Sequence, residues 1–337
     1  MIRNGVTTGG IVHVSTTSGH RADYQALFAS LFGLAPSVGR VRFRTLPLFG
    51  AAKRLLFATL DDDLPGFAMT AMLRSCLGRP TVGVFLRPQS CLGIGPRATV
   101  KRLIFRTLRR VPHVSIVSII PFAFLPGSEC VATHWIHDPQ LWDDLDRPDQ
   151  ACTKTAAAIR QLAAGRPVLA FLGRVSPIKG FHQLVAAVKA RPDLLQTYAI
   201  LVAGVVDPAC RGAAAELSAK GAILWDRHLT EAEMAAVYAE ASLIWACYDP
   251  GYDQASGIFG RAVQRGRTAV IRDGAMIGRY ADLLGHPCLS LPADPVEAAR
   301  RLTEAARPHR CETDHTATGL KLHLWRRQNI DTIGSLL

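Results

Sequence analysis

The strongest constraint on the fold is a regular alternation of short apolar runs and helical patterns in the second half of the chain. One helical pattern places Phe181, Leu184 and Val188 on one face, and another begins with the capping-box pair Thr230 and Glu233. Because neighbouring parallel strands need crossover helices, this alternation predicts a doubly wound parallel sheet. The six runs that we interpret as its strands are residues 167–173, 198–204, 222–225, 242–248, 268–271 and 288–291.

Two loops of this half carry an unusual density of glycine and charge. In the common strand order 3-2-1-4-5-6, ligands bind between the first and fourth strands, where residues 173–180 and 248–260 would meet. Gly251, Gly257 and Gly260 permit a close approach of backbone to a ligand, and a helix that begins near Gly257 would direct its positive N-terminus there. The pattern favours a ligand that bears phosphate.

The first half also has an α/β pattern, although a less regular one. Helical patterns occupy residues 24–32 and 66–77, and a small-residue turn, "TTSGHRADY", follows the first strand. The stretch 135–150, which is rich in Asp and contains Pro, is the best connector to the second half. The strand candidates of the first half are residues 10–15, 54–59, 81–86 and 114–120.

The positive charge of the chain is confined to its first third. Residues 1–120 hold 16 Lys or Arg and four Asp, whereas the other 217 residues hold 23 basic and 23 acidic side chains, so the net charge of +12 belongs to the first part. Such asymmetry suggests an anionic partner. The densest basic segment, 100–111, predicts a helix with Leu103, Phe105 and Leu108 on one side and cations on much of the rest. It is either an ordinary surface helix or a contact for an anionic membrane.

Composition argues against several other classes of protein. We expect neither a secretory signal nor a membrane span, because no apolar stretch has the required length. The eight cysteines form no CxxC pair, which fits reduced thiols in the cytoplasm, and we expect no structural metal. We interpret the Asp triplet at 61–63 as a solvated strand end and not as a metal-binding DxD motif. Nucleic-acid binding lacks the aromatic interleaving that it would need.

Four segments of the second half, in their order and separation, resemble a known enzyme family. They are "FLGRVSPIKGF", "ILVAG", "LTEAEMAAVYAEASLIW" and "YDQASGIFGRAVQRGRTAVI", and they are similar to the C-terminal half of the retaining GT-B glycosyltransferases of family 4. The resemblance implies an α/β fold of two Rossmann-like domains that face each other across a cleft. It places an acceptor domain at 1–145, a nucleotide-sugar domain at 146–310, and at 311–337 a C-terminal helix that packs back on the N-terminal domain.

The resemblance assigns a role to the two cations in the loop after the first strand of the second domain. The family's Arg and Lys in this loop grip the donor diphosphate, and they match Arg174 and Lys179. Charge grows on the diphosphate as the glycosidic bond breaks, so two fixed cations would stabilise the leaving group without a metal ion or another cofactor. Surface salt bridges are the competing explanation for this pair. Gly257 and Ile258 complete the substrate-binding residues expected in this loop region.

Two further positions of the second domain depart from the family pattern. Relatives carry two glutamates with seven residues between them, and this chain has Asp253 and Arg261 at that spacing. Asp253 keeps the charge, so a contact to a donor-sugar hydroxyl remains expected. Arg261 can only donate hydrogen bonds where a glutamate would accept them from the ribose. It indicates either an extra anionic group on the donor or a weak or lost transferase.

Substrate contacts are also expected in the N-terminal domain. Several relatives place a histidine after a strand, beside the reacting sugar carbon, and this chain has Arg87 there, which suggests a contact to a donor or acceptor phosphate and not a base. Gly19 and His20 occupy the turn that corresponds to the glycine-rich loop on the acceptor side. A solvent-exposed histidine without a role is the alternative for His20.

The sequence as a whole predicts a metal-independent glycosyltransferase. It would move a hexose-like sugar from a nucleoside diphosphate to a lipid-linked or polysaccharide acceptor at the cytoplasmic membrane face. The alternative is a catalytically inactive GT-B relative that binds a partner in glycan assembly, and Arg261 and the missing histidine favour that reading.

Overall fold

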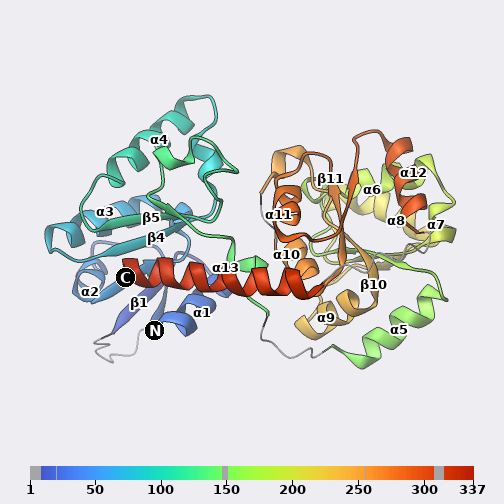
Figure 1. Cartoon of the computed structure of the whole chain (residues 1–337), viewed down its shortest axis with the longest axis horizontal. Helices are drawn as coiled ribbons and strands as arrows, with labels where there is room; N and C mark the ends of the chain where they lie inside the picture. Colours follow the sequence, from blue (N-terminus) through green and yellow to red (C-terminus); the bar gives the residue numbers. More distant parts are fainter. Residues whose placement is uncertain (1–8, 20, 146–150, 255, 307–314) are drawn as a thin grey trace. The chain divides into compact units, whose positions relative to one another are not determined.

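The chain folds into two compact units. The computed structural model describes residues 9–19, 21–145, 151–254, 256–306 and 315–337. Unit 1 comprises Met1–Pro139 and Leu324–Leu337, and unit 2 comprises Gln140–His323. Each unit has a sheet of its own, flanked by helices (Figure 1).

Unit 1 is built on a parallel sheet whose described strands follow the order β2-β1-β3-β4-β5-β6. Residues of β1 pair with β2 on one side and with β3 on the other, so the order reverses between β1 and β3. Ligands of open α/β sheets bind at such a switch point. The strands are β1 (Gly10–Val14), β2 (Leu34–Val38), β3 (Arg54–Phe57), β4 (Thr81–Phe85), β5 (Val114–Ser118) and β6 (His134–Trp135).

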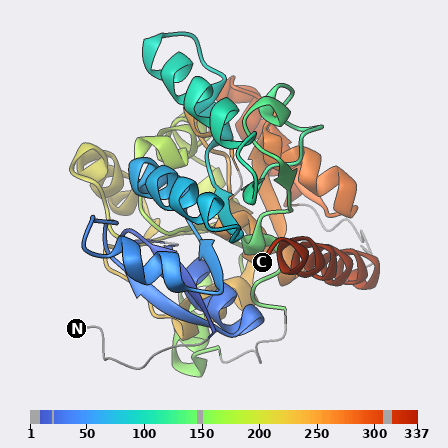
Figure 2. The same cartoon turned by 90° about the vertical axis from the view of Figure 1, so that its left-hand side faces the viewer.

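The helices of unit 1 form a layer on each side of this sheet (Figure 1). One layer packs on a core that includes Phe57, Phe67 and Phe105, and the opposite layer holds α1 and the end of α13. Figures 1 and 2 both show α4 at the top of the view, at the periphery of the unit. The helices are α1 (Arg21–Phe32), α2 (Leu46–Ala51), α3 (Leu64–Cys76), α4 (Pro96–Leu108) and α13 (His315–Leu336), which begins in unit 2.

Unit 2 has the predicted doubly wound sheet. Its order, β12-β11-β10-β7-β8-β9, is 3-2-1-4-5-6 read from the other edge, and all its pairings are parallel. The switch point therefore lies between β7 and β10, as expected. The strands are β7 (Val168–Leu172), β8 (Ala199–Ala203), β9 (Ile223–Trp225), β10 (Ala241–Trp245), β11 (Thr268–Arg272) and β12 (Cys288–Leu291).

Helices cover both faces of the sheet of unit 2. Helices α6, α7, α8 and α12 share one large core with the strands, and Figure 1 shows α9, α10 and α11 on the other side. The helices are α5 (Thr153–Ala163), α6 (Phe181–Ala190), α7 (Leu194–Thr197), α8 (Arg211–Ala219), α9 (Glu231–Glu240), α10 (Gly257–Gln264), α11 (Met276–Leu284) and α12 (Pro295–Ala305). No described helix has the length and apolar character to span a membrane.

The final helix, α13, is divided between the units, and its last residues belong to unit 1. There Asn329 exchanges two hydrogen bonds with the backbone of His137, at 3.0 and 2.6 Å. The ring of Trp325 stacks on the ring of His137 with centroids 3.6 Å apart. These contacts hold the end of the helix against the segment that follows β6. That the two domains face each other across a cleft stays a prediction.

Two details of unit 1 differ from the sequence prediction. Leu103, predicted on the apolar side of its helix, is 66% exposed, because α4 turns Phe105 and Leu108 to the core instead. The sequence also does not indicate β2 and β6. The first contains Pro36, which lacks a backbone N–H and is tolerated because an edge strand has no neighbour on one side, and the second has only two residues.

Candidate functional site

The loop after β7 lies between the loops that follow β8 and β10. At its start the amide of Val175 donates to the carbonyl of Val205 at 2.9 Å. At its end Trp245 Nε1 donates to the carbonyl of Gly180 at 3.2 Å. Residues 173–180 therefore occupy the carboxyl edge of the sheet at its switch point, where the topology places a ligand.

Two glycines allow the backbones of these loops to approach each other. Gly180 has a φ of +78°, and a Cβ there would lie 1.7 Å from the carbonyl oxygen of Cys247. Gly204 has a φ of +148°, and a Cβ there would lie 1.8 Å from the carbonyl oxygen of Gly173. A larger residue at either position would force the loop after β7 out of place.

Arg174 is directed to the β8 side of this loop. Its Nε donates to Asp207 Oδ2 at 3.1 Å and its Nη2 donates to Oδ1, so the pair is bidentate. These hydrogen bonds raise the pKa of Arg174. The side chain is 71% exposed, so water screens the pair and its contribution to stability is small. Asp207 therefore orients a cation that remains open to an anionic ligand.

Lys179 is directed to the β10 side. Its Nζ lies 3.8 Å from the ring centroid of Tyr252 and 4.6 Å from that of Tyr248, a distance at which a cation is attracted to an aromatic face. Tyr248 is itself fixed by a buried hydrogen bond with the hydroxyl of Ser256, and burial raises its pKa. Two tyrosines thus restrain the ammonium group while they leave its N–H donors for other partners.

The two cations share one loop but have different partners. Arg174 pairs with Asp207 on the β8 side of the loop, whereas Lys179 contacts Tyr252 on the β10 side. Both nevertheless extend from the carboxyl edge beside the switch point. An anion that contacts both side chains would have to extend across the loop. A diphosphate is longer than a single phosphate and therefore suits this arrangement better.

Asp253 is partly committed to the fold. Its Oδ1 accepts a hydrogen bond from the amide of Met276 at 2.8 Å and lies 3.3 Å from Nη2 of Arg272. It therefore ties the loop after β10 to the start of α11. Oδ2 accepts no hydrogen bond within the described part of the chain, so one oxygen remains for a hydroxyl.

The start of α10 is shaped mainly by packing against Gln140. A Cβ on Gly260 would lie 2.1 Å from the Gln140 carbonyl oxygen, and one on Gly257 would lie 3.3 Å from its side chain. Ile258 contacts the loop after β7, because its Cδ1 would lie 3.6 Å from a Cβ on Gly173. Gly257 and Gly260 thus allow α10 to pack closely against Gln140. Ile258 borders the loop that carries Arg174 and Lys179.

Arg261 lies among carboxylates. Its Nη1 is 3.0 Å from Glu231 Oε2, its Nη2 is 3.5 Å from Asp143 Oδ2, and Asp144 Oδ2 is 3.9 Å away. Burial lowers the pKa of Arg261, but the charges of Asp143 and Asp144 outweigh it, so the pKa is raised overall. Burial also raises the pKa of Asp143. The charge of Arg261 is balanced by the protein.

Unit 1 has its own group of charged residues at the switch point. Asp62 binds Arg21 through both oxygens, at 2.5 and 2.7 Å, and lies 3.2 Å from Nη2 of Arg87. The residues follow β1, β3 and β4, and therefore belong to the carboxyl edge of the sheet. Although burial opposes it, pairing with Arg21 lowers the pKa of Asp62. Two arginines are held side by side on one carboxylate.

The interpretation of the Asp triplet at 61–63 as a solvated strand end is wrong. Asp61 is buried, and its two oxygens accept hydrogen bonds from the amides of Leu86 and Arg87 at 3.0 and 2.8 Å. Burial raises the pKa of Asp61 to about 6. Asp63 caps α3 by accepting from the amide of Gly66. The triplet thus builds the local fold around Arg87.

The structure shows few contacts for the remaining site residues that the sequence predicts in unit 1. Gly19 has a φ of +61° and no atom near its Cβ position, and His20 lies outside the described residues. Within the described residues no group of three or more His, Cys, Asp or Glu side chains is placed to hold a metal ion.

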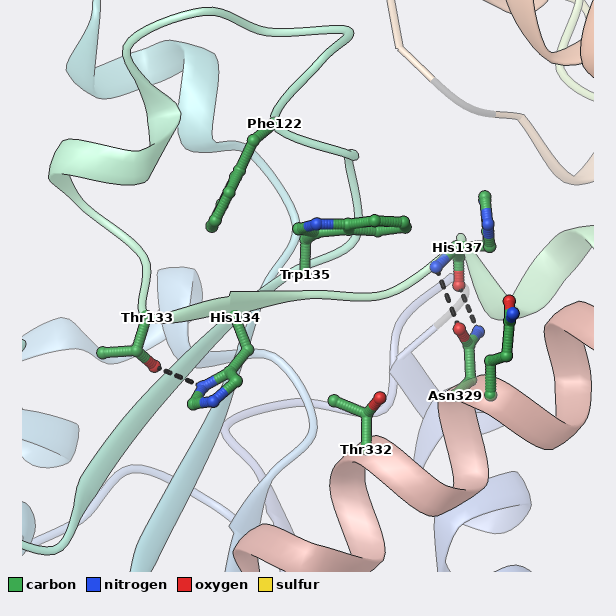
Figure 3. Close-up of a pocket in the computed structure, with 8 residues that line it drawn as sticks. Phe122, Thr133, His134, Trp135, His137, Asn329 and Thr332 are labelled. Atoms are coloured by element: carbon green, nitrogen blue, oxygen red, sulfur yellow. Dashed lines mark hydrogen bonds between the residues drawn. The ribbon is translucent and has the colours of Figure 1, made fainter.

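A cavity of about 450 Å³ in unit 1 lies between β6 and α13 (Figure 3). Figure 3 shows Phe122 and Trp135 above Thr332 of α13, with His134 beside them. The cavity lies at the β6 edge of the sheet, whereas Arg21 and Arg87 follow β1 and β4. The cavity is therefore separate from the charged group at the switch point.

Several residues at these sites carry no signal in the sequence. Asp207 follows β8 and Glu231 begins α9, and nothing in their local sequence distinguishes them from ordinary surface residues, whereas Tyr252 lies in the predicted loop 248–260. Arg21 and Asp62 stand 41 positions apart. A rule that every loop at the carboxyl edge contributes to the site would have included all of them.

The fold is similar to that of solved glycosyltransferases along the whole chain. HepE of Anabaena in complex with UDP has a TM-score of 0.68 and 12% identity, and the match covers 97% of this chain and 100% of HepE. Other structures of HepE hold UDP with glucose, or UDP-glucose. A glycosyltransferase from Rickettsia africae matches with a TM-score of 0.62 and 11% identity over 98% of this chain and 99% of its own.

A trehalose-phosphate synthase from Burkholderia xenovorans, in complex with glucose-6-phosphate, is a more distant match. Its TM-score is 0.53 and its identity 11%, over 82% of this chain and 78% of the synthase. No protein-family model and no curated protein matches the sequence. The chain has the α/β fold of GT-B glycosyltransferases, with two parallel six-stranded sheets in its described residues.

Proposed function

We propose that this protein is a glycosyltransferase that moves a hexose-like sugar from a nucleoside diphosphate to an acceptor. The observation that carries the proposal is the pair Arg174 and Lys179, which extends from the carboxyl edge of unit 2 beside the switch point. Similar folds bind UDP and UDP-glucose, which supports a nucleotide sugar as the donor. We propose further that the enzyme is of the retaining type and needs no metal ion.

Stabilisation of the leaving group is the chemistry that these residues supply. As the bond between the sugar and the diphosphate breaks, negative charge accumulates on the phosphate oxygens, and fixed cations lower the energy of that state. Lys179 is already positioned by its two tyrosines. Arg174 is oriented by an exposed pair with Asp207, which the diphosphate, with its two negative charges, can displace at small cost. Asp253 Oδ2 is the hydroxyl acceptor that we assign to the donor sugar.

Alanine variants of the two cations test this proposal. Because one electrostatic contact to a developing charge is worth about a hundredfold or more in kcat, Arg174→Ala and Lys179→Ala should each lower transfer by at least that factor. Arg300→Ala and Lys220→Ala are matched controls, since both remove exposed, ion-paired cations of the same unit, Arg300 within α12 and Lys220 directly after α8. Undiminished transfer in both site variants would reject the assignment.

A catalytically inactive protein makes a different prediction. Thermal unfolding in the presence of UDP, GDP, ADP and CDP sugars should show stabilisation by one donor, followed by its hydrolysis or transfer. A protein that no nucleotide sugar stabilises would be the inactive relative. The carboxylates around Arg261 favour the active enzyme over the inactive relative, because they balance the positive charge that suggested a lost ribose contact.

We also propose that the acceptor is lipid-linked and is reached at the cytoplasmic face of a membrane. Helix α4 and the turn before it expose Ile94, Val100 and Leu103 to solvent, next to basic residues of the same segment. Exposed apolar side chains among cations are the features of a surface that binds anionic lipid. Helix α4 also lies at the periphery of unit 1 (Figure 2).

Flotation with vesicles tests the membrane contact. The protein should float with vesicles that contain phosphatidylglycerol and stay behind with phosphatidylcholine alone, and high salt should weaken the binding. The double variant Val100→Ser, Leu103→Ser should lose flotation, whereas Leu162→Ser, an exposed leucine of α5, should keep it. Equal flotation of the three proteins would exclude α4 as the contact.

A further inference from the structure

We infer that Glu231, held by Arg261, is the carboxylate that accepts hydrogen bonds from the ribose of the donor nucleotide. The inference rests on the proposed function, because it needs a nucleotide bound at the switch point of unit 2. It concerns the position where the sequence predicts a nucleoside contact but contains an arginine. A ribose diol donates two hydrogen bonds, and a guanidinium group cannot accept them.

The place of Glu231 in the topology puts it on the ligand side of the sheet. Helix α9 follows β9 and leads to β10, so it begins where β9 ends, at the carboxyl edge. Glu231 is its first residue. The loop 173–180 is at the same edge.

A chain of contacts leads from the cation-bearing loop to Glu231. Gly173 at the start of that loop borders Ile258, and Ile258 and Arg261 lie on one face of α10 because they are three residues apart. Arg261 Nη1 is 3.0 Å from Glu231 Oε2. The hydroxyl of Tyr238 donates to the carbonyl of Ile258 at 3.2 Å, which fixes α9 against α10. A nucleotide whose diphosphate lies on the loop would extend along this face.

Glu231 is the accessible one of the three carboxylates around Arg261. Its side chain is 75% exposed, whereas those of Asp143 and Asp144 are 14% and 5% exposed. Oε2 is used by Arg261, and Oε1 accepts no hydrogen bond from the residues that the structure describes. One oxygen is therefore anchored and the other faces solvent, which is the arrangement that a hydroxyl acceptor needs.

Arg261 acts here as a positioning residue. An exposed glutamate at the first position of a helix has several rotamers of similar energy, and holding one of them costs entropy. Arg261 is confined by the partly buried carboxylate of Asp143 and the buried one of Asp144, so its pair with Glu231 fixes that side chain. The positive N-terminus of α9 favours the carboxylate as well.

Binding of nucleotides with and without ribose hydroxyls tests the inference. We would titrate wild type with UDP, GDP, ADP and CDP by calorimetry, and then compare the tightest of them with its 2′-deoxy form and with inorganic pyrophosphate. Glu231→Ala should weaken the ribonucleotide about ten- to hundredfold, because charge-assisted hydrogen bonds are lost. Affinity for pyrophosphate should stay unchanged. The preference of wild type for the ribonucleotide over its 2′-deoxy form should disappear.

Two further variants separate a ribose contact from a structural effect. Glu240→Gln, at the other end of α9, removes a carboxylate that pairs with Arg160 and should bind like wild type. Arg261→Ala should reduce the discrimination between ribose and deoxyribose, since it frees Glu231. Normal ribonucleotide affinity or intact discrimination in Glu231→Ala would overturn the inference, and so would an equal loss for pyrophosphate. If wild type bound no nucleotide, the proposed function would fail, and this inference with it.

Discussion

The buried carboxyl of Asp61 should give unit 1 a measurable dependence of stability on pH. Its pKa is about 6 in the folded protein, against an ordinary value of 3.8, because burial penalises the charge. Between these values the folded state holds a proton that the unfolded chain has released. Stability therefore falls as the pH rises through this window, by about 3 kcal/mol at about 1.4 kcal/mol for each pKa unit.

Asp61→Asn removes this titration and keeps the size of the side chain. Asparagine has no charge to desolvate, but its NH₂ group would face one of the two amides that now donate to Asp61, those of Leu86 and Arg87. That clash costs about 1–3 kcal/mol at any pH. Relative to wild type, the variant should thus be clearly less stable near pH 4 and close to wild type near pH 7.

Hydrogen exchange followed by mass spectrometry can measure this in the full chain. Peptides that cover β3 and β4 report the local free energy of opening, after correction for the intrinsic exchange rate at each pH. Asp62 titrates in the opposite direction, since its pKa is lowered, and it is common to both proteins. The difference between variant and wild type therefore isolates Asp61. Parallel profiles, with a constant difference over this range, would refute the reasoning.

Three further predictions concern unit 2. Tyr252→Leu removes a cation–π contact and should weaken pyrophosphate about two- to thirtyfold, whereas Tyr252→Phe keeps the ring and should bind normally in the same calorimetric titration. Gly180→Ala places a Cβ against Cys247 in a left-handed backbone position, so it should abolish pyrophosphate binding and lower the melting temperature. Thr230→Ala loses the cap of α9 and should cost about 1 kcal/mol, measured by hydrogen exchange in residues 231–240.

The sequence predicts the sheet of unit 2 well because its central strands are buried on both faces. Such strands are continuous apolar runs, and β7, β8 and β10 are examples that the sequence shows directly. Strand β2 has the sequence LAPSV, with polar and half-exposed positions, and nothing in it distinguishes a strand from a turn. Its place follows only from the pairing of Pro36 with Val12, a contact that forms in the folded chain.

The candidate site divides in the same way. The loop with Arg174 and Lys179 is predictable, because parallel strands fix where a loop at a switch point must lie. Its partners are only partly predictable, since Tyr252 lies in the predicted loop 248–260, whereas Asp207 comes from the loop after β8, which the sequence does not single out. A cation in a sequence has a position but no counter-charge, and its chemistry depends on both.

Arg261 shows why a departure from a motif is a weak argument about activity when it is read from one position. The sequence shows a positive charge where a negative one is expected, and the simplest conclusion is a lost contact. In the fold, Arg261 is surrounded by carboxylates from a connector and from α9, so the local charge is not positive. The requirement of a ribose is an acceptor oxygen at this edge, whichever residue provides it. Glu231 provides such an oxygen. Measurement of nucleotide binding, and not the identity of residue 261, therefore distinguishes an active enzyme from an inactive protein.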